Sequence, residues 1–85
     1  MNYTTVTEVN SDSPMIGTIG WETGQEFMKK LAEACESHFD CDIDMIQPIN
    51  TDELKEIPMQ VLVTIHEDTN ITNEIEIWLE PTWLY

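Results

Sequence analysis

One segment of the chain repeats its apolar residues at the spacing of an α-helix, whereas the segments around it alternate with a period of two. Thr23-Gly24-Gln25-Glu26 forms a capping box, in which the Thr23 hydroxyl accepts the Glu26 amide hydrogen and the Glu26 side chain returns to the Thr23 amide. The apolar residues that follow share one broad helical arc: Phe27, Met28, Leu31, Ala32, Ala34, Cys35, His38 and Phe39. We therefore predict one amphipathic helix from Thr23 to about Phe39, lying on a core.

The remaining segments with β-branched or alternating residues predict strands. They are residues 3–9, 15–21, 40–45, 59–66 and 74–80. The segment 15–21 contains two glycines and is expected to be bulged or at an edge. Pro48 and Pro81 are expected to end the strands that precede them, residues 67–73 to form a loop, and residues 51–56 to form a charged connection with one helical turn.

These elements predict a single α+β domain over residues 1–85. One amphipathic helix packs on one face of a roughly four-stranded antiparallel sheet, in β(β)αβββ order. A domain of this size buries about 60–65% of the surface of its unfolded chain. The side chains expected to face the core are Cys41, Ile43, Met45, Val61, Val63, Ile65, Ile75, Ile77 and Leu79.

The charge of the chain narrows the class of partner. Seventeen acidic residues stand against three lysines and no arginine, which gives a formal net charge of -14. Such a chain repels nucleic-acid phosphates and acidic membrane surfaces and attracts basic proteins. We expect a basic protein partner and no direct contact with nucleic acid or membrane. The alternative is that the acidity serves only solubility, for which a net charge of about 2–8 in magnitude suffices.

Strand alternation places part of this charge opposite the core. Successive carboxylates on one strand face lie about 6.8 Å apart, and they loosely approximate the phosphates of a duplex, which rises about 3.4 Å per nucleotide of each strand. The residues expected to bind the partner are Asp40, Asp42, Asp44, Glu74, Glu76, Trp78 and Glu80.

Trp78 alternates onto the same face as these carboxylates. One register of a hairpin between residues 59–66 and 74–80 sets Leu62 opposite Trp78 and His66 opposite Glu74, as a cross-strand ion pair. Trp78 is then either an exposed interface anchor or a residue covered by the aromatic segment 83–85.

The spacing Cys35-x-x-His38-x-x-Cys41 is the one that resembles a zinc site, with Asp40, Asp42 or His66 as a fourth ligand. Cys35 and His38 lie within the apolar arc of the helix and Cys41 on an inward strand face, so a structural role is favoured and no metal or cofactor is expected. The run from Asp40 to Asp44 begins like a calcium loop but has Met45 and Thr51 where that loop needs Gly and Glu.

The sequence offers no catalytic constellation. It has no glycine-rich phosphate loop followed by lysine and no arginine to hold an anionic substrate, so we expect no enzymatic activity. It also has neither a secretory leader nor an apolar run of membrane-spanning length, so we expect a cytoplasmic protein.

In composition the chain resembles the small acidic proteins of phages and mobile elements that inhibit restriction or CRISPR machinery, and the acidic immunity proteins of nucleases. This predicts a non-enzymatic inhibitor of anti-CRISPR, anti-restriction or nuclease-immunity type that imitates a nucleic acid and binds a basic nuclease or CRISPR effector. The alternative is a small structural or adaptor domain that joins a complex or forms a homodimer through Trp83-Leu84-Tyr85.

Overall fold

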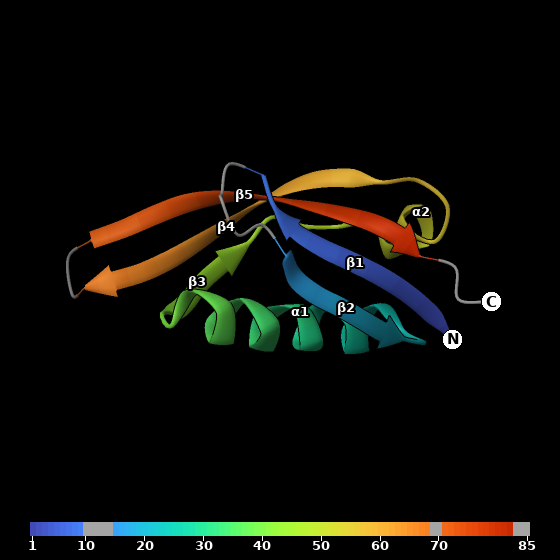
Figure 1. Cartoon of the computed structure of the whole chain (residues 1–85), viewed down its shortest axis with the longest axis horizontal. Coiled ribbons are helices and arrows are strands. Elements are labelled where there is room, and N and C mark those ends of the chain that lie inside the picture. Colours follow the sequence, from blue (N-terminus) through green and yellow to red (C-terminus); the bar gives the residue numbers. More distant parts are fainter. Residues whose placement is uncertain (10–14, 69–70, 83–85) are drawn as a thin grey trace.

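The computed structural model describes residues 1–9, 15–68 and 71–82, and at residues 67, 68 and 71 it describes the backbone alone. It has an α+β fold, in which one main helix packs on a curled five-stranded antiparallel sheet (Figure 1). The elements are β1 (Asn2–Glu8), β2 (Met15–Trp21), α1 (Gly24–Phe39), β3 (Asp42–Ile46), α2 (Thr51–Leu54), β4 (Met59–Asp68) and β5 (Ile71–Thr82). The predicted fold class is confirmed: each of the five predicted strand segments contains a strand, and the charged connection at residues 51–56 contains the short helix α2.

The strands lie in the order β2-β1-β5-β4-β3, so that the first and the last strand of the chain are neighbours in the middle of the sheet. Tyr3 pairs with Thr82, which brings the start of β1 beside the end of β5. The β4–β5 hairpin is the longest part of the sheet and projects beyond β1 and β2 at one end of the molecule (Figure 1).

The core fills the space between the sheet and α1. Phe27, Leu31 and Cys35 are the buried residues of α1, and the Trp21 ring lies 5.2 Å from that of Phe27. The Trp21 indole donates a buried hydrogen bond of 2.9 Å to the Thr4 hydroxyl. From the sheet and α2 the buried apolar residues are Val6, Ile19, Trp21, Leu54, Val61, Val63, Ile65, Ile77 and Leu79.

The helix begins at the predicted cap. The Thr23 hydroxyl accepts from the Glu26 amide at 3.1 Å, but the Glu26 carboxylate accepts from the amide of Glu22 at 2.7 Å and not from that of Thr23. The helix ends at Phe39, because Asp40 adopts a left-handed conformation with φ of 54°. Asp40 is therefore the C-cap of α1, and the prediction that it begins a strand is wrong.

A bulge in β3 corrects a second prediction. The pairing with β4 shifts register between Ile43 and Met45, which reverses the inside-outside alternation at that point. Met45, expected in the core, is exposed, and Ile46 packs against the core in its place.

The two long strands extend further than predicted. β4 continues to Asp68 and β5 begins at Ile71, so most of the loop expected at 67–73 is strand. Pro81 does not end β5. The pairing of β4 with β5 stops at Met59 opposite Leu79, so the missing amide hydrogen of Pro81 faces the side where β4 is absent.

The hairpin register differs from the prediction by two residues. Trp78 is opposite Gln60, Leu62 is opposite Glu76, and His66 is opposite Thr72. A shift of two leaves every side chain on its predicted face but changes its cross-strand neighbours.

The segment 15–21 is both an edge strand and bulged, as predicted, because Met15 and Gly17 pair with the consecutive residues Thr7 and Val6 and leave Ile16 as the extra residue. Gly17 there has a φ of 156°, which residues with a side chain rarely adopt. The Lys30 ammonium group donates a hydrogen bond of 2.7 Å to the Gly20 carbonyl on this edge. Within the described part of the chain, no helix is long and apolar enough to cross a membrane.

Candidate interaction face

The sheet has one face toward α1 and one that no described helix covers, which we call the outer face. Strand alternation sends the side chains between the core positions to this outer face. On the three central strands these are Tyr3, Thr5, Thr7, Gln60, Leu62, Thr64, His66, Thr72, Glu74, Glu76, Trp78, Glu80 and Thr82.

Three of the predicted carboxylates form a row on β5. Glu74, Glu76 and Glu80 are all exposed on the outer face, as predicted, and they extend over about 20 Å of strand. Because β5 is a central strand, this row runs along the middle of the sheet rather than along an edge. We call these three residues the acidic row.

The three aspartates before β4 are less regular. Asp42 pairs with His66 across the β3–β4 ladder and so lies on the outer face, two strands from β5. Asp44 lies at the bulge, where its carboxylate contacts the His66 ring at 3.1 Å. Asp40 caps α1 and is not part of the sheet. The predicted row at 40–44 is therefore not a regular row.

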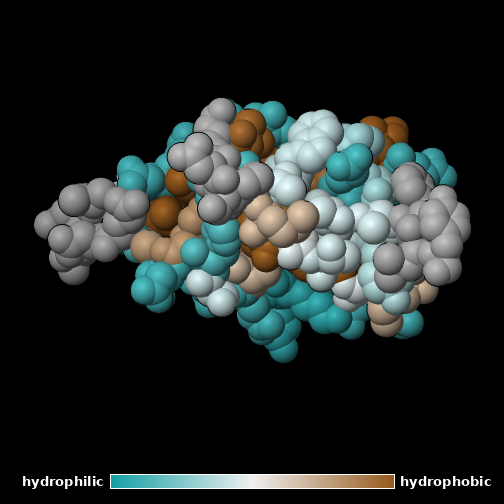
Figure 2. Space-filling model, in the orientation of Figure 1, coloured by the Kyte–Doolittle hydropathy of each residue, from teal (hydrophilic) through white to brown (hydrophobic). Residues whose placement is uncertain are grey.

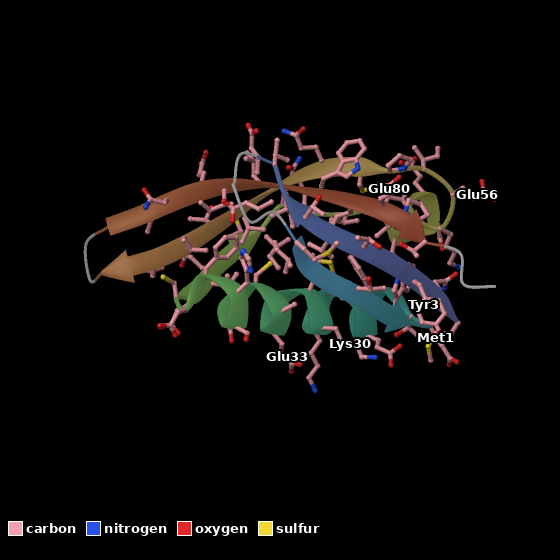
Figure 3. All side chains as sticks on the ribbon, in the orientation of Figure 1. Met1, Tyr3, Lys30, Glu33, Glu56 and Glu80 are labelled. Carbon is pink, nitrogen blue, oxygen red and sulfur yellow. The ribbon has the colours of Figure 1, made fainter. Side chains whose placement is uncertain are left out.

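None of the three lysines of the chain belongs to a strand of the sheet. Lys29 and Lys30 belong to α1 and Lys55 follows α2, so no strand carries a basic residue apart from histidine. Lys30 pairs with Glu26 at 3.7 Å and Lys55 with Asp52 at 3.5 Å. Figure 3 shows Glu33 on the side of α1 away from the sheet and Glu80 on β5 at the other side of the molecule, whereas Lys30 reaches the β2 edge at the Gly20 carbonyl.

Trp78 lies on β5 between Glu76 and Glu80 of the acidic row and is partly exposed. Its neighbours across the strands are Gln60 and Thr7. With these two residues, Glu8 and Val9 it lines a shallow hollow of about 360 Å³. The interpretation that residues 83–85 cover Trp78 lies outside the described residues.

Both histidines contact a carboxylate. His66 contacts Asp44, and the predicted pair with Glu74 is wrong because the register places Thr72 opposite His66. His38 contacts Glu8 at 3.3 Å, which joins the last turn of α1 to the end of β1. Both pairs tie neighbouring elements together when the histidine is protonated.

The zinc-like spacing does not assemble a site among the residues that the structure describes. Cys35 is fully buried in the core, and burial, with a smaller contribution from the charge of Glu36, raises its pKa to about 11. Cys41 is half-buried and His38 is turned to Glu8. Over residues 1–9, 15–68 and 71–82, no three His, Cys, Asp or Glu side chains are grouped to hold a metal ion.

The sequence did not reveal which other side chains join this face. β1 and β2 contribute Thr5, Thr7 and Thr18 beside the acidic row, and Thr5 lies between Glu80 and Thr18 in the register. The alternation of Thr and Val in residues 3–9 indicates which of their side chains share a face, but it cannot show that β1 pairs with β5. In Figure 2, brown apolar patches on the visible face are separated by pale and teal residues.

Comparison of the chain with protein-family models, with curated proteins and with solved structures found no match.

Proposed function

We propose that the protein is a non-enzymatic inhibitor that binds a basic, nucleic-acid-binding protein through the outer face of its sheet. The observation that carries the proposal is the acidic row of Glu74, Glu76 and Glu80, exposed on a sheet face where no lysine or arginine balances it. Carboxylates on exposed strand faces are ordinarily interspersed with basic cross-strand partners. A nuclease or a CRISPR effector offers the complementary surface, in its nucleic-acid channel.

The physical effect of such a face is on the rate of association. A concentrated negative potential attracts a cationic partner over a distance of about 10 Å at ~0.1 M salt, and it raises the association rate more than it raises the affinity. The inhibitor would occupy the channel in place of the phosphates, without contact to nucleic acid or membrane. We place it in the cytoplasm, where such partners act.

The test compares two variants that carry the same change of net charge. One reverses the acidic row, Glu74→Lys, Glu76→Lys and Glu80→Lys. The other reverses three exposed glutamates on the helices, Glu33→Lys, Glu36→Lys and Glu53→Lys. Each is added to basic nucleases and CRISPR effector complexes at low and at high salt, and both nucleic-acid cleavage and complex formation are measured.

We expect the native protein to block cleavage at low salt and to be released as salt rises. Reversal of the acidic row should weaken inhibition by about tenfold or more, and reversal of the helix glutamates should weaken it much less. Equal loss in both variants would show that net charge alone acts, and this would overturn the assignment of the outer face.

The second candidate is an adaptor domain that self-associates, with its acidity serving solubility. It is favoured by two exposed apolar side chains that lie outside the strands, Met1 at 70% and Ile57 at 56%. This candidate predicts a homodimer whose stability does not depend on salt and which disappears when residues 83–85 are deleted. Sedimentation of the native and shortened chains at two salt concentrations distinguishes it from the inhibitor.

A further inference from the structure

Each strand, or the residue that directly follows it, carries an exposed or partly exposed apolar side chain on the outer face or beside it. Met45 of β3 is 60% exposed, Leu62 of β4 38%, Val9 after β1 40% and Met15 of β2 60%, and Trp78 of β5 is partly exposed. We call these five residues the apolar band. Four of the six most exposed large apolar side chains of the described structure belong to it.

The strand register places these residues in three adjacent rows across the sheet, where residues such as Glu76 and Thr7 lie between them. Leu62 is opposite Glu76, and the carbonyl of Glu76 accepts a hydrogen bond of 3.0 Å from the amide of Val9. Trp78 is opposite Thr7, which in turn is opposite Met15. With strands about 4.8 Å apart, the band crosses roughly 19 Å of the sheet, diagonally to the strands.

The acidic row crosses this band. On β5, Glu74 and Glu76 lie on one side of Trp78 and Glu80 lies on the other. Each apolar residue near the centre of the face therefore has a carboxylate beside it along the strand or across the ladder. Apolar anchors ringed by charge are typical of interfaces in which a buried centre is enclosed by a polar rim.

The negative charge of the outer face indicates which kind of partner can bind there. A second copy placed on this face would bring two acidic rows together, with no lysine or arginine on any strand to neutralise them. Like charges brought together across an interface suppress association. A partner surface with Lys and Arg beside an apolar ridge is complementary to both: its ridge packs on the apolar band, and its basic side chains pair with the acidic row.

We infer that the outer face binds a protein surface in which an apolar ridge is flanked by lysine and arginine side chains, with the band slowing release and the acidic row speeding association. The inference rests on the proposed function and specifies the partner's surface. A surface that only imitates phosphates would need no such band.

The probes are two short synthetic peptides of equal length and equal lysine number, one alternating Lys with Leu and one alternating Lys with Ser. Binding rates are measured on the full chain at low and high salt. The band variant is Leu62→Thr with Trp78→Thr, which keeps strand-forming residues. Its control is Ile57→Thr, an exposed apolar residue outside the band.

We expect the Lys-Leu peptide to bind about tenfold tighter or more than the Lys-Ser peptide, mainly through slower release. The band variant should lose this difference and keep its salt dependence, the control should keep both, and reversal of the acidic row should slow association of both peptides. Circular dichroism confirms that each variant is folded.

Equal affinity for the two peptides, or a band variant that binds as the native chain does, would overturn the inference and leave the proposed function standing. Failure of both peptides to bind at low salt would overturn both. Formation of a dimer at high salt that the band variant abolishes would assign the band to a second copy, and would likewise overturn the inference.

Discussion

The two cysteines have very different surroundings. Cys35 lies on the buried side of α1 within the core, whereas Cys41 follows the helix and is half-buried. The pKa of Cys35 is raised from 9.0 to about 11, first because burial disfavours the thiolate and then because Glu36 is close. The protonated form is therefore favoured more strongly in the folded than in the unfolded chain.

We predict that only one thiol of the native protein reacts readily with a disulfide reagent at pH 8. With a pKa of about 11, only ~0.1% of Cys35 is thiolate at that pH, and burial also blocks access. Denaturant should expose the second thiol. The variant Cys41→Ala should show no rapid reaction in the native state, and rapid reaction of two thiols in the native chain would contradict the burial of Cys35.

At the level of elements, β5 pairs with β4 on one side and with β1 on the other, but β1 pairs with only part of its length. Backbone groups of successive residues point to alternate sides, and the carbonyl of Glu76 points to β1. Thr72 and Glu74 therefore also point to that side, where the pairing of described residues with β1 ends at Val9. Asn73 points to β4 and pairs with Ile65.

We predict that proline is tolerated better at position 72 than at position 73. Thr72→Pro removes an amide hydrogen on the side that β1 does not reach, whereas Asn73→Pro removes one from the β4–β5 ladder. The second change should lower the free energy of unfolding by about 1–3 kcal/mol more than the first. Urea unfolding of both variants measures the difference, and equal destabilisation would contradict the register.

The elements that could be predicted from the sequence are those with a local signal. The capping box and the 3.6-residue period located α1, and the alternation of Glu with Ile in residues 74–80 located β5 and assigned both of its faces. The bulge at Ile43 and Met45 could not be foreseen, because it depends on pairing with β4. The hairpin register was wrong for the same reason, since a shift of two residues preserves the pattern of faces.

At the scale of the whole molecule, the net charge of -14 opposes folding through self-repulsion. Only a few ion pairs offset it among the described residues, and Lys30 and Lys55 make two of them at the surface. Exposed pairs of this kind contribute little stability. Screening by salt should therefore stabilise the fold.

We predict that the melting temperature rises by several degrees between low salt and ~0.5 M sodium chloride, because ~1 kcal/mol corresponds to about 4–8 °C in a domain of this size. The variant with lysine at positions 33, 36 and 53 should show a smaller rise, since its net charge is closer to zero. Calorimetry measures both. A melting temperature that falls with salt would show that ion pairs outweigh the repulsion.

Only part of the candidate site could be predicted from the sequence, because the site depends on how the strands of the whole molecule pair. Alternation alone put Glu74, Glu76, Trp78 and Glu80 on one face. The contribution of β1 and β2 requires that the first strand pair with the last, and no local pattern encodes that.

The pairing of β1 with β5 also has a consequence for how the chain reaches its native state. The hairpin of β1 and β2 is complete within the first 21 residues, yet its place in the sheet exists only once residues 71–82 have been made. Pairing β1 with β5 closes the whole chain between them into a loop, which is entropically costly. Contacts between residues so far apart in sequence slow folding. The docking of these two ends, rather than the formation of α1, is therefore expected to set the folding rate.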